Sequence, residues 1–164
     1  MSSQLDVSIR NKKTNETVNL FWFSTTPARQ LYSVLNTTFE KKKGKEDSLW
    51  DLELVPKPLD DSLIQEVLDF YDEEIKSDKN YIEQCISNNE RLENRIRNIN
   101  NKDYKEMYDR IEEDIFSNEQ AIKEMNEDIE ELKFHKAHFE FARKVLESNT
   151  YNKDKEYELV YTLD

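Results

Sequence analysis

The sequence predicts an α+β protein in which a small mixed β-sheet head carries a long antiparallel α-helical hairpin (a coiled coil) inserted before the last strand. Residues 59–164 contain neither glycine nor proline, so nothing in this long segment breaks a helix. Over most of it apolar residues recur at alternating spacings of three and four, which is the heptad pattern of packed helices. Shorter stretches near both ends alternate apolar and polar residues, as half-buried strands do. We expect residues 1–58 plus 133–164 to form the head and residues 59–132 to form the acidic hairpin.

The first two elements of the head are predicted to be strands. Leu5, Val7 and Ile9 alternate with polar residues, which indicates a strand over residues 4–10. A polar loop then leads to residues 18–24, where apolar side chains occupy both faces. This second strand is expected either to be covered on both sides or to leave one face exposed.

A helix and a third strand should follow. Thr25 and Pro27 are typical of a helix N-cap and first turn, and helical spacing continues as far as Phe39. Lys41-Lys42-Lys43 suit a helix C-terminus, and Gly44 is expected to stop the helix. Residues 49–55 are predicted to form a strand that ends at two prolines, and residues 157–163 alternate as a last strand.

The order strand, strand, helix, strand, two long helices, strand resembles the ubiquitin-like β-grasp fold over residues 4–55 and 156–164, apart from the helical hairpin. The resemblance is one of pattern, without a residue signature. It implies a helix lying across the N-terminal hairpin and a last strand paired beside the first. A generic α+β sandwich is the alternative.

The hairpin is predicted from two apolar stripes that face each other. Asp60-Asp61-Ser62 form a cap and acidic first turn for the first helix, and residues 98–103 form the natural turn. Folding the chain there places Leu92 near Ile111 and Ile82 near Ile122. Asn89 and Asn118 fall on the stripes, one layer apart, and are expected to fix the register of the hairpin. The stripes comprise Ile75, Ile82, Cys85, Asn89, Leu92, Ile96 and Ile99, interrupted by Asp78, and Tyr104, Tyr108, Ile111, Ile115, Asn118, Ile122, Met125, Ile129 and Leu132.

Composition excludes several classes of protein. No apolar run approaches the ~18 residues that a membrane span requires, and no signal peptide is recognisable. A single cysteine, Cys85, cannot form an internal disulfide, which indicates a reducing compartment, and we expect a cytoplasmic protein. With Gly44 as the only glycine, a glycine-rich phosphate loop is impossible. We therefore expect no cofactor and no enzymatic activity.

Charge is distributed unevenly along the chain. The net charge is −12, but residues 1–55 hold eight Lys/Arg against seven Asp/Glu, whereas residues 56–164 hold sixteen against twenty-nine. Residues 103–131 alone carry twelve acids and three bases. Such a surface attracts basic proteins and repels nucleic acid and membrane phosphates, although an ordinary solvated face is the simpler interpretation. The candidate partner-binding residues are Asp72, Glu73, Glu74, Glu112, Glu113, Asp114, Glu127, Asp128, Glu130 and Glu131.

Two smaller clusters are weaker candidates. A basic hairpin tip could contact nucleic acid or merely offset neighbouring acids; it comprises Arg91, Arg95, Arg97, Lys102 and Lys105. His135 and His138 lie on one helical face one turn after Glu131, a set that can hold a divalent metal ion. The alternative is that both imidazoles pack among the neighbouring phenylalanines.

These observations favour a non-enzymatic, acidic protein-binding regulator or inhibitor that docks on a basic, nucleic-acid-handling partner by nucleic-acid mimicry. In size and charge the chain resembles phage-encoded antagonists of host defence nucleases, anti-CRISPR proteins among them, which would place it in a host-cell cytoplasm. One alternative is a structural coiled-coil adaptor in which the stripes pair between chains, as in a homodimer. A second is nucleic-acid binding through the basic tip.

Overall fold

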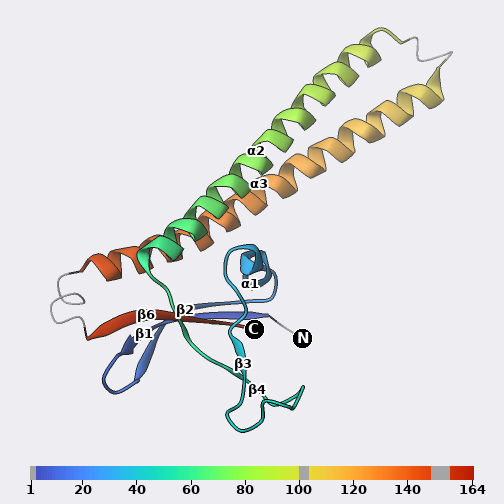
Figure 1. The fold of residues 1–164 in the computed structure, drawn as a ribbon. Coiled ribbons are helices and arrows are strands. Elements are labelled where there is room, and N and C mark those ends of the chain that lie inside the picture. Colours follow the sequence, from blue (N-terminus) through green and yellow to red (C-terminus); the bar gives the residue numbers. More distant parts are fainter. Residues whose placement is uncertain (1–2, 100–103, 149–155) are drawn as a thin grey trace. The chain divides into compact units, whose positions relative to one another are not determined.

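The computed structural model describes residues 3–99, 104–148 and 156–164, and it contains one main sheet and two long helices (Figure 1). The chain forms two compact units: residues 1–70 with 135–164, here called the sheet unit, and residues 71–134, here called the hairpin unit. The α+β class with a helical hairpin before the last strand is confirmed. The elements are β1 (Gln4–Asn11), β2 (Thr17–Ser24), α1 (Thr26–Gln30), the 3₁₀ turn η1 (Leu31–Ser33), β3 (Phe39–Lys41), β4 (Leu52–Leu54), β5 (Lys57–Pro58), α2 (Asp61–Arg97), α3 (Lys105–Glu147) and β6 (Tyr157–Leu163).

The main sheet has the strand order β2-β1-β6-β5, and its neighbouring strands are antiparallel. Val7 of β1 pairs with Phe21 on one side and with Tyr161 on the other. Because side chains alternate between the faces of a sheet, these positions and their neighbours two residues away share one face. That face is the core of the sheet unit, and its buried residues are Leu5, Val7, Phe21, Phe23, Leu159, Tyr161 and Leu163.

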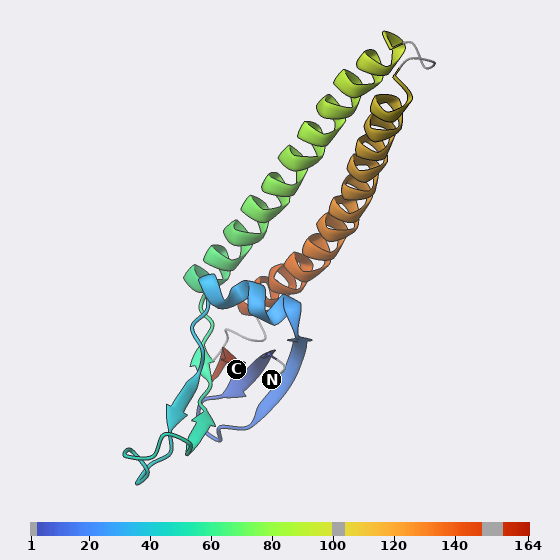
Figure 2. The same cartoon turned by 90° about the vertical axis from the view of Figure 1, so that its right-hand side faces the viewer.

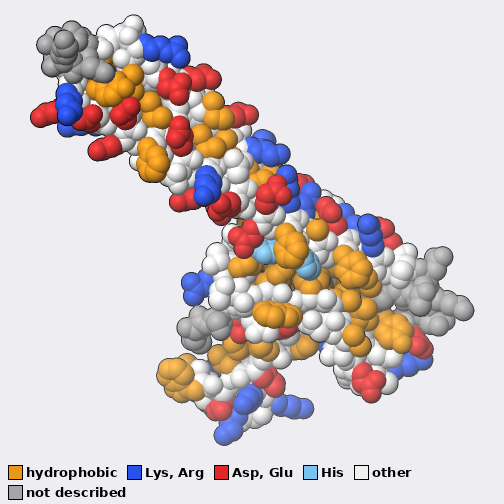
Figure 3. Space-filling model, turned by 180° about the vertical axis from the view of Figure 1, so that it is seen from behind, with side chains coloured by type: hydrophobic (Ala, Val, Ile, Leu, Met, Phe, Trp, Pro, Cys, Tyr) orange, Lys and Arg blue, Asp and Glu red, His pale blue; other side chains and the backbone are white. Residues whose placement is uncertain are grey.

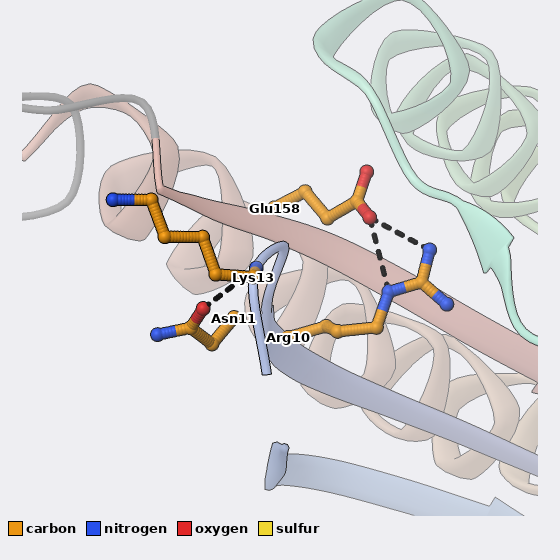
Figure 4. Close-up of polar contacts among 4 residues, drawn as sticks. All are labelled: Arg10, Asn11, Lys13 and Glu158. Atoms are coloured by element: carbon orange, nitrogen blue, oxygen red, sulfur yellow. Dashed lines mark hydrogen bonds and ion pairs between the residues drawn. The ribbon is translucent and has the colours of Figure 1, made fainter. Parts of the chain in front are cut away.

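β6 lies beside β1, as the resemblance to the β-grasp implies, and the two strands are antiparallel. Polar side chains reinforce this pairing where β6 begins. Arg10 of β1 donates from Nε (3.0 Å) and Nη2 (2.6 Å) to Oε1 of Glu158, which pairs with it across the strands (Figure 4). Asn11 then starts the turn to β2, where its Oδ1 accepts the backbone N–H of Lys13 at 2.9 Å. These bonds fix the first hairpin and the last strand in one register.

The helix predicted from Thr25 to Lys43 is much shorter in the structure. Thr25 occupies the N-cap position and Pro27 lies in the first turn, as predicted, but Thr25 has φ 58° and its side chain makes no capping hydrogen bond. The helical segment ends at Ser33, and the chain is extended by Thr38, which is buried. Thr38 donates its N–H to the carbonyl of Leu163 (2.8 Å), and its Oγ1 accepts the N–H of Leu163 (2.9 Å). Pairing with the end of β6 therefore replaces helix continuation.

The segment after Thr38 forms a separate two-stranded sheet, β3–β4, which the sequence did not predict. Lys41, expected in a helix C-terminus, lies in β3. Gly44 has φ 81° in the connection to β4, where a left-handed conformation favours glycine. The strand predicted over residues 49–55 is reduced to β4, and Trp50 before it is 90% exposed.

Helices cover the buried face of the sheet. The C-terminal part of α3 packs on β2, where the rings of Phe139 and Phe21 meet edge to face at 5.2 Å between centroids. Arg143 of α3 also pairs with Asp61 at the start of α2 (3.0 Å). In this part of α3 Phe139 and Ala142 are buried whereas Phe141 is exposed, so burial is confined to part of the helix surface. The other helical residues of this core are Ala28, Leu31, Ile64, Val67, Leu68 and Ala142.

The two long helices lie side by side through the hairpin unit (Figures 1 and 2). α2 has 37 residues and α3 has 43, which correspond to about 55 Å and about 65 Å. The predicted cap of α2 is confirmed, because Oδ1 of Asp60 accepts the N–H of Leu63 at 2.8 Å. α2 ends at Arg97, where the turn was expected; residues 100–103 of that turn lie outside the described residues.

The predicted apolar stripes form the interface between α2 and α3. Every described stripe residue is buried or half-buried except Tyr104, whereas almost all other hairpin positions are exposed. Cys85 is a buried free thiol on this interface, as expected of a small core residue. The heptad pattern therefore pairs within one chain. The buried members are Ile75, Cys85, Asn89, Ile111, Ile129 and Leu132.

Asn89 and Asn118 form the polar pair that the stripes predicted. Nδ2 of Asn118 donates to Oδ1 of Asn89 at 2.8 Å, and Nδ2 of Asn89 donates to the carbonyl of Ile115 at 3.4 Å. The side chains span the one-layer offset expected from sequence. Asn89 is buried and Asn118 half-buried, and each bonds to the other helix, so a shift of register would leave polar groups unpaired.

Removing half of this pair is expected to destabilise the hairpin. Asn118→Ala leaves Oδ1 of Asn89 without its donor, which should lower the free energy of unfolding by about 1–2 kcal/mol. The double variant Asn89→Leu/Asn118→Leu should be more stable than the wild type but should populate other oligomers, since the register is no longer specified. Circular dichroism during urea unfolding and light scattering test both effects. A double variant less stable than Asn118→Ala would contradict this role.

Candidate functional site

The hairpin part of α3 has most of the excess negative charge. Residues 104–134 contain eleven Asp/Glu against four Lys/Arg, whereas residues 71–99 of α2 contain seven against five. At least seven carboxylates on α3 therefore have no base available within their own segment. Figure 3 shows acidic side chains spread along the exposed surface of the hairpin, with apolar patches between them.

The ten predicted acidic residues are all exposed, but the structure does not gather them into one cluster. Three lie on α2 and seven lie on α3, where heptad positions distribute them around the helix rather than along a single face. Glu130 forms an ion pair with Lys133 at 3.3 Å. The ten residues therefore describe a charged helix more than a defined site. Asp72, Glu73 and Glu74 belong to α2; Glu112, Glu113, Asp114, Glu127, Asp128, Glu130 and Glu131 belong to α3.

One part of the acidic surface has a definite geometry around Phe116, which the sequence analysis missed. The Phe116 side chain is 61% exposed on the side of α3 away from the stripe. Together with Ser117 and three acids it lines a shallow, open depression. The acids are Asp109, Glu112 and Glu113. A large apolar ring here contributes little to the fold, and it lies within reach of a partner. The signal was present in the sequence, since Phe116 follows the stripe residue Ile115 directly and so leaves the stripe.

A second shallow depression lies further along the same helix. Its lining includes Ile122 from the stripe and the two predicted residues Glu127 and Glu130. The remaining lining is polar or charged: Glu119, Lys123 and Asn126. α3 thus presents two acid-lined hollows along one helix.

The basic tip residues lie at the ends of the two helices that adjoin the turn. Arg91, Arg95 and Arg97 occupy the last turns of α2, where cations complement the helix dipole, and Arg91 Nη2 lies 3.5 Å from Oδ1 of Asn88. Lys105 begins α3, and Lys102 lies outside the described residues. All four described side chains are exposed. Stabilisation of the α2 C-terminus is sufficient to explain these arginines, and no ligand needs to be invoked.

The two histidines pack against aromatic rings in the sheet unit. His135 is buried with its ring 4.6 Å from that of Phe23, and His138 lies 5.3 Å from Phe21 and 5.2 Å from Phe23, between centroids. In the part of the chain that the structure describes, no three His, Cys, Asp or Glu side chains approach closely enough to hold a metal ion. The packing interpretation therefore accounts for both imidazoles.

An acidic residue interrupts the hairpin interface. Asp78 occupies a stripe position and is half-buried, and the Asp128 carboxylate acts on it from α3. Burial first, and then the negative charge of Asp128, raise the pKa of the Asp78 carboxyl above its usual value of 3.8. At neutral pH the ionised form therefore costs the folded hairpin some stability.

Comparison with protein families, curated proteins and solved structures found no match to this chain. Within residues 3–99, 104–148 and 156–164, no helix has the length and hydrophobicity needed to span a membrane.

Neutralising Asp78 is expected to stabilise the hairpin in a pH-dependent way. Asp78→Asn should raise the free energy of unfolding at pH 7 by up to about 1 kcal/mol, because it removes a partly desolvated charge facing Asp128. As the pH falls through the raised pKa, the wild-type carboxyl gains a proton in the folded state and recovers this stability. The difference between variant and wild type should therefore vanish below the ordinary pKa.

Urea unfolding at neutral pH and near pH 3.5, an acidity set by the ordinary carboxyl pKa of about 3.9, measures this difference. Glu83→Gln, an exposed change on the same helix, is the control and should alter stability little at either pH. An equal gain for Asp78→Asn at both pH values would contradict the electrostatic explanation.

Proposed function

We propose that this protein is a non-enzymatic regulator or inhibitor that binds a basic, nucleic-acid-handling protein through the exposed surface of α3 in the hairpin unit. The observation that supports this most is the pairing of an exposed aromatic ring with a one-sided excess of acid. Residues 104–134 contain eleven acids but only four bases, and Phe116 lies among three of the carboxylates. Charge of one sign favours a partner of the opposite sign.

The density of charge on α3 is comparable with that of a nucleic acid strand. Residues 106–131 carry all eleven of these acids, and 26 helical residues span about 39 Å, which gives one carboxylate per about 3.5 Å. A DNA strand has one phosphate per about 3.4 Å of helix axis, and the duplex has twice that density. A groove of Lys and Arg residues contacts one side of a helix, so it would meet part of this charge, of which Arg110 and Lys123 offset two carboxylates.

Phe116 supplies what charge alone does not, namely an apolar anchor. Binding energy at protein interfaces concentrates in a few large side chains surrounded by a polar rim. An exposed phenylalanine bordered by Asp109, Glu112 and Glu113 has this arrangement. A partner arginine can stack on the ring while it pairs with a neighbouring carboxylate. The surface therefore favours a partner whose positive charge comes from arginine over one whose charge comes from lysine.

The biological setting follows from the same chemistry. A small acidic protein that occupies a nucleic-acid groove would inhibit the nuclease or nucleic-acid-binding protein to which that groove belongs. Size and charge support a phage or mobile-element antagonist of host defence, acting in the host-cell cytoplasm.

The two alternative functions have less support from the geometry. Assembly through the heptad stripes needs those stripes to pair between chains, whereas in the structure they pack together within one chain. Nucleic-acid binding through the tip rests on arginines at a helix C-terminus, in a hairpin whose other charges are predominantly acidic.

The charge contribution is tested with matched variants of the whole chain. Affinity capture from the native host, followed by mass spectrometry, identifies the partner, which is expected to be basic. Neutralising three acids on α3, as Glu112→Gln, Glu113→Gln and Glu127→Gln together, should weaken its binding by about tenfold or more. The control neutralises three exposed acids on α2, Glu83, Glu90 and Glu93, and should cost less than about threefold because only net charge changes.

Binding should also weaken steeply as salt rises, and single-stranded nucleic acid should compete with the protein for its partner. Equal effects of the two triple variants would show that net charge matters rather than the α3 surface. Salt-insensitive binding, or a partner that is not basic, would overturn the proposed function.

The anchor is tested separately. Phe116→Ala should weaken binding by about 10–100-fold, as truncation of a central aromatic residue does, while leaving the unfolding midpoint nearly unchanged. Tyr81→Ala, which removes an exposed aromatic ring from α2, is the matched control and should leave affinity unchanged. Unaltered binding by Phe116→Ala would remove the anchor from the proposal, and the charge surface would then stand alone.

A further inference from the structure

The β2 strand is unusual in this chain because it carries no charge. Charged residues make up 37% of the protein, yet the sequence of β2 is TVNLFWFS. Its buried face holds Phe21 and Phe23, as the core requires. On exposed positions, however, β2 has Val18 (67% exposed) and Trp22 (59% exposed). Packing within the sheet unit does not account for these two side chains.

β2 is also an edge of the main sheet, since β1 is its partner in the part of the chain that the structure describes. The backbone N–H of Thr25 donates to the carbonyl of Ser3. In an antiparallel pair every second residue bonds to the neighbouring strand, so Phe23 and Phe21 also bond to β1. The intervening residues, Trp22 and Ser24, therefore direct their N–H and C=O groups away from β1. These groups form an open hydrogen-bonding edge.

Natural edge strands are usually protected against pairing by charged side chains, prolines or bulges. β2 contains neither a charge nor a proline. Its register against β1 shifts between Val7 and Ser8, which places one extra residue on β2 at Leu20. This bulge bends the strand, but it leaves Phe21–Ser24 regular and able to pair.

We propose that the edge of β2 pairs with β2 of a second copy of this chain, in an antiparallel arrangement about a two-fold axis. Such an axis brings identical strands together, so any charge on the strand would approach a like charge. Two copies that each carry a net charge of −12 repel one another. Because β2 itself has no charged residue, pairing through β2 places no like charges of the two strands side by side. The pairing covers part of Trp22 and satisfies the open amides of Trp22 and Ser24.

The area available implies a weak, concentration-dependent dimer. A tryptophan buries about 150–250 Å² when fully covered, so Trp22 of the two copies contributes at most a few hundred Å². Stable dimers generally bury about 1,200–2,000 Å² in total. We therefore expect dissociation in the micromolar range or above.

Sedimentation velocity on the full chain, from about 10 μM to about 500 μM, tests the proposal over the range expected for so small an interface. The mass should rise from that of the 19.8 kDa monomer toward twice that value. Trp22→Lys should abolish the rise, because it removes the apolar area and places like charges together. Trp50→Lys makes the same change at a more exposed tryptophan outside β2 and should leave association unchanged.

Amide hydrogen exchange provides a second, position-specific measurement. At the highest concentration the amides of Trp22 and Ser24 should exchange about tenfold more slowly than in dilute solution, whereas that of Phe23, already bonded to β1, should not change. A chain that stays monomeric throughout, or that associates equally well as Trp22→Lys, would overturn the proposal. So would an unchanged exchange rate at Trp22 and Ser24 in a sample that does associate.

Discussion

The pairing of the two apolar stripes within one chain is the interaction on which the hairpin depends. Each helix gives two of every seven positions to the interface and leaves the other five to solvent. The Asn89–Asn118 hydrogen bond fixes how the stripes align. Once this interface is formed, the outer positions are free of folding constraints. Phe116 is therefore informative, because the hairpin does not need a large apolar ring outside the stripe.

The charge on α3 is not what stability alone would select. Acids three or four residues apart repel on a helix, at about 0.2–0.5 kcal/mol per pair. Asp109 with Glu113, Glu124 with Asp128, and Glu127 with Glu131 are all such pairs. Over residues 71–99, the part of α2 in the hairpin unit, the excess is smaller, with seven acids against five bases. The basic partner proposed for α3 would neutralise these pairs on binding.

Long periodic segments could be predicted from the sequence, and short ones could not. The heptad spacing repeats many times along both stripes, and Asp60 is a strong helix N-cap. α2, α3 and their interface were therefore predictable. The helix expected through Phe39 failed because Thr38 bonds to Leu163, more than a hundred residues away. No local pattern encodes that pairing, after which the chain continues into β3. Phe116 and the uncharged β2 were visible in the sequence, but their meaning required knowing which positions are exposed.

The two proposed surfaces differ in their physics and so need not compete. The α3 surface relies on unscreened charge, and raising the ionic strength weakens it. Pairing of β2 relies on hydrogen bonds and apolar burial, while the net charge of each copy opposes it. Added salt screens that repulsion and therefore favours β2 pairing while it weakens binding at α3. A basic partner on α3 would act on β2 in the same direction as salt, since it neutralises the charge that keeps two copies apart. Binding at one surface would thus promote association at the other through charge alone, without a change of conformation.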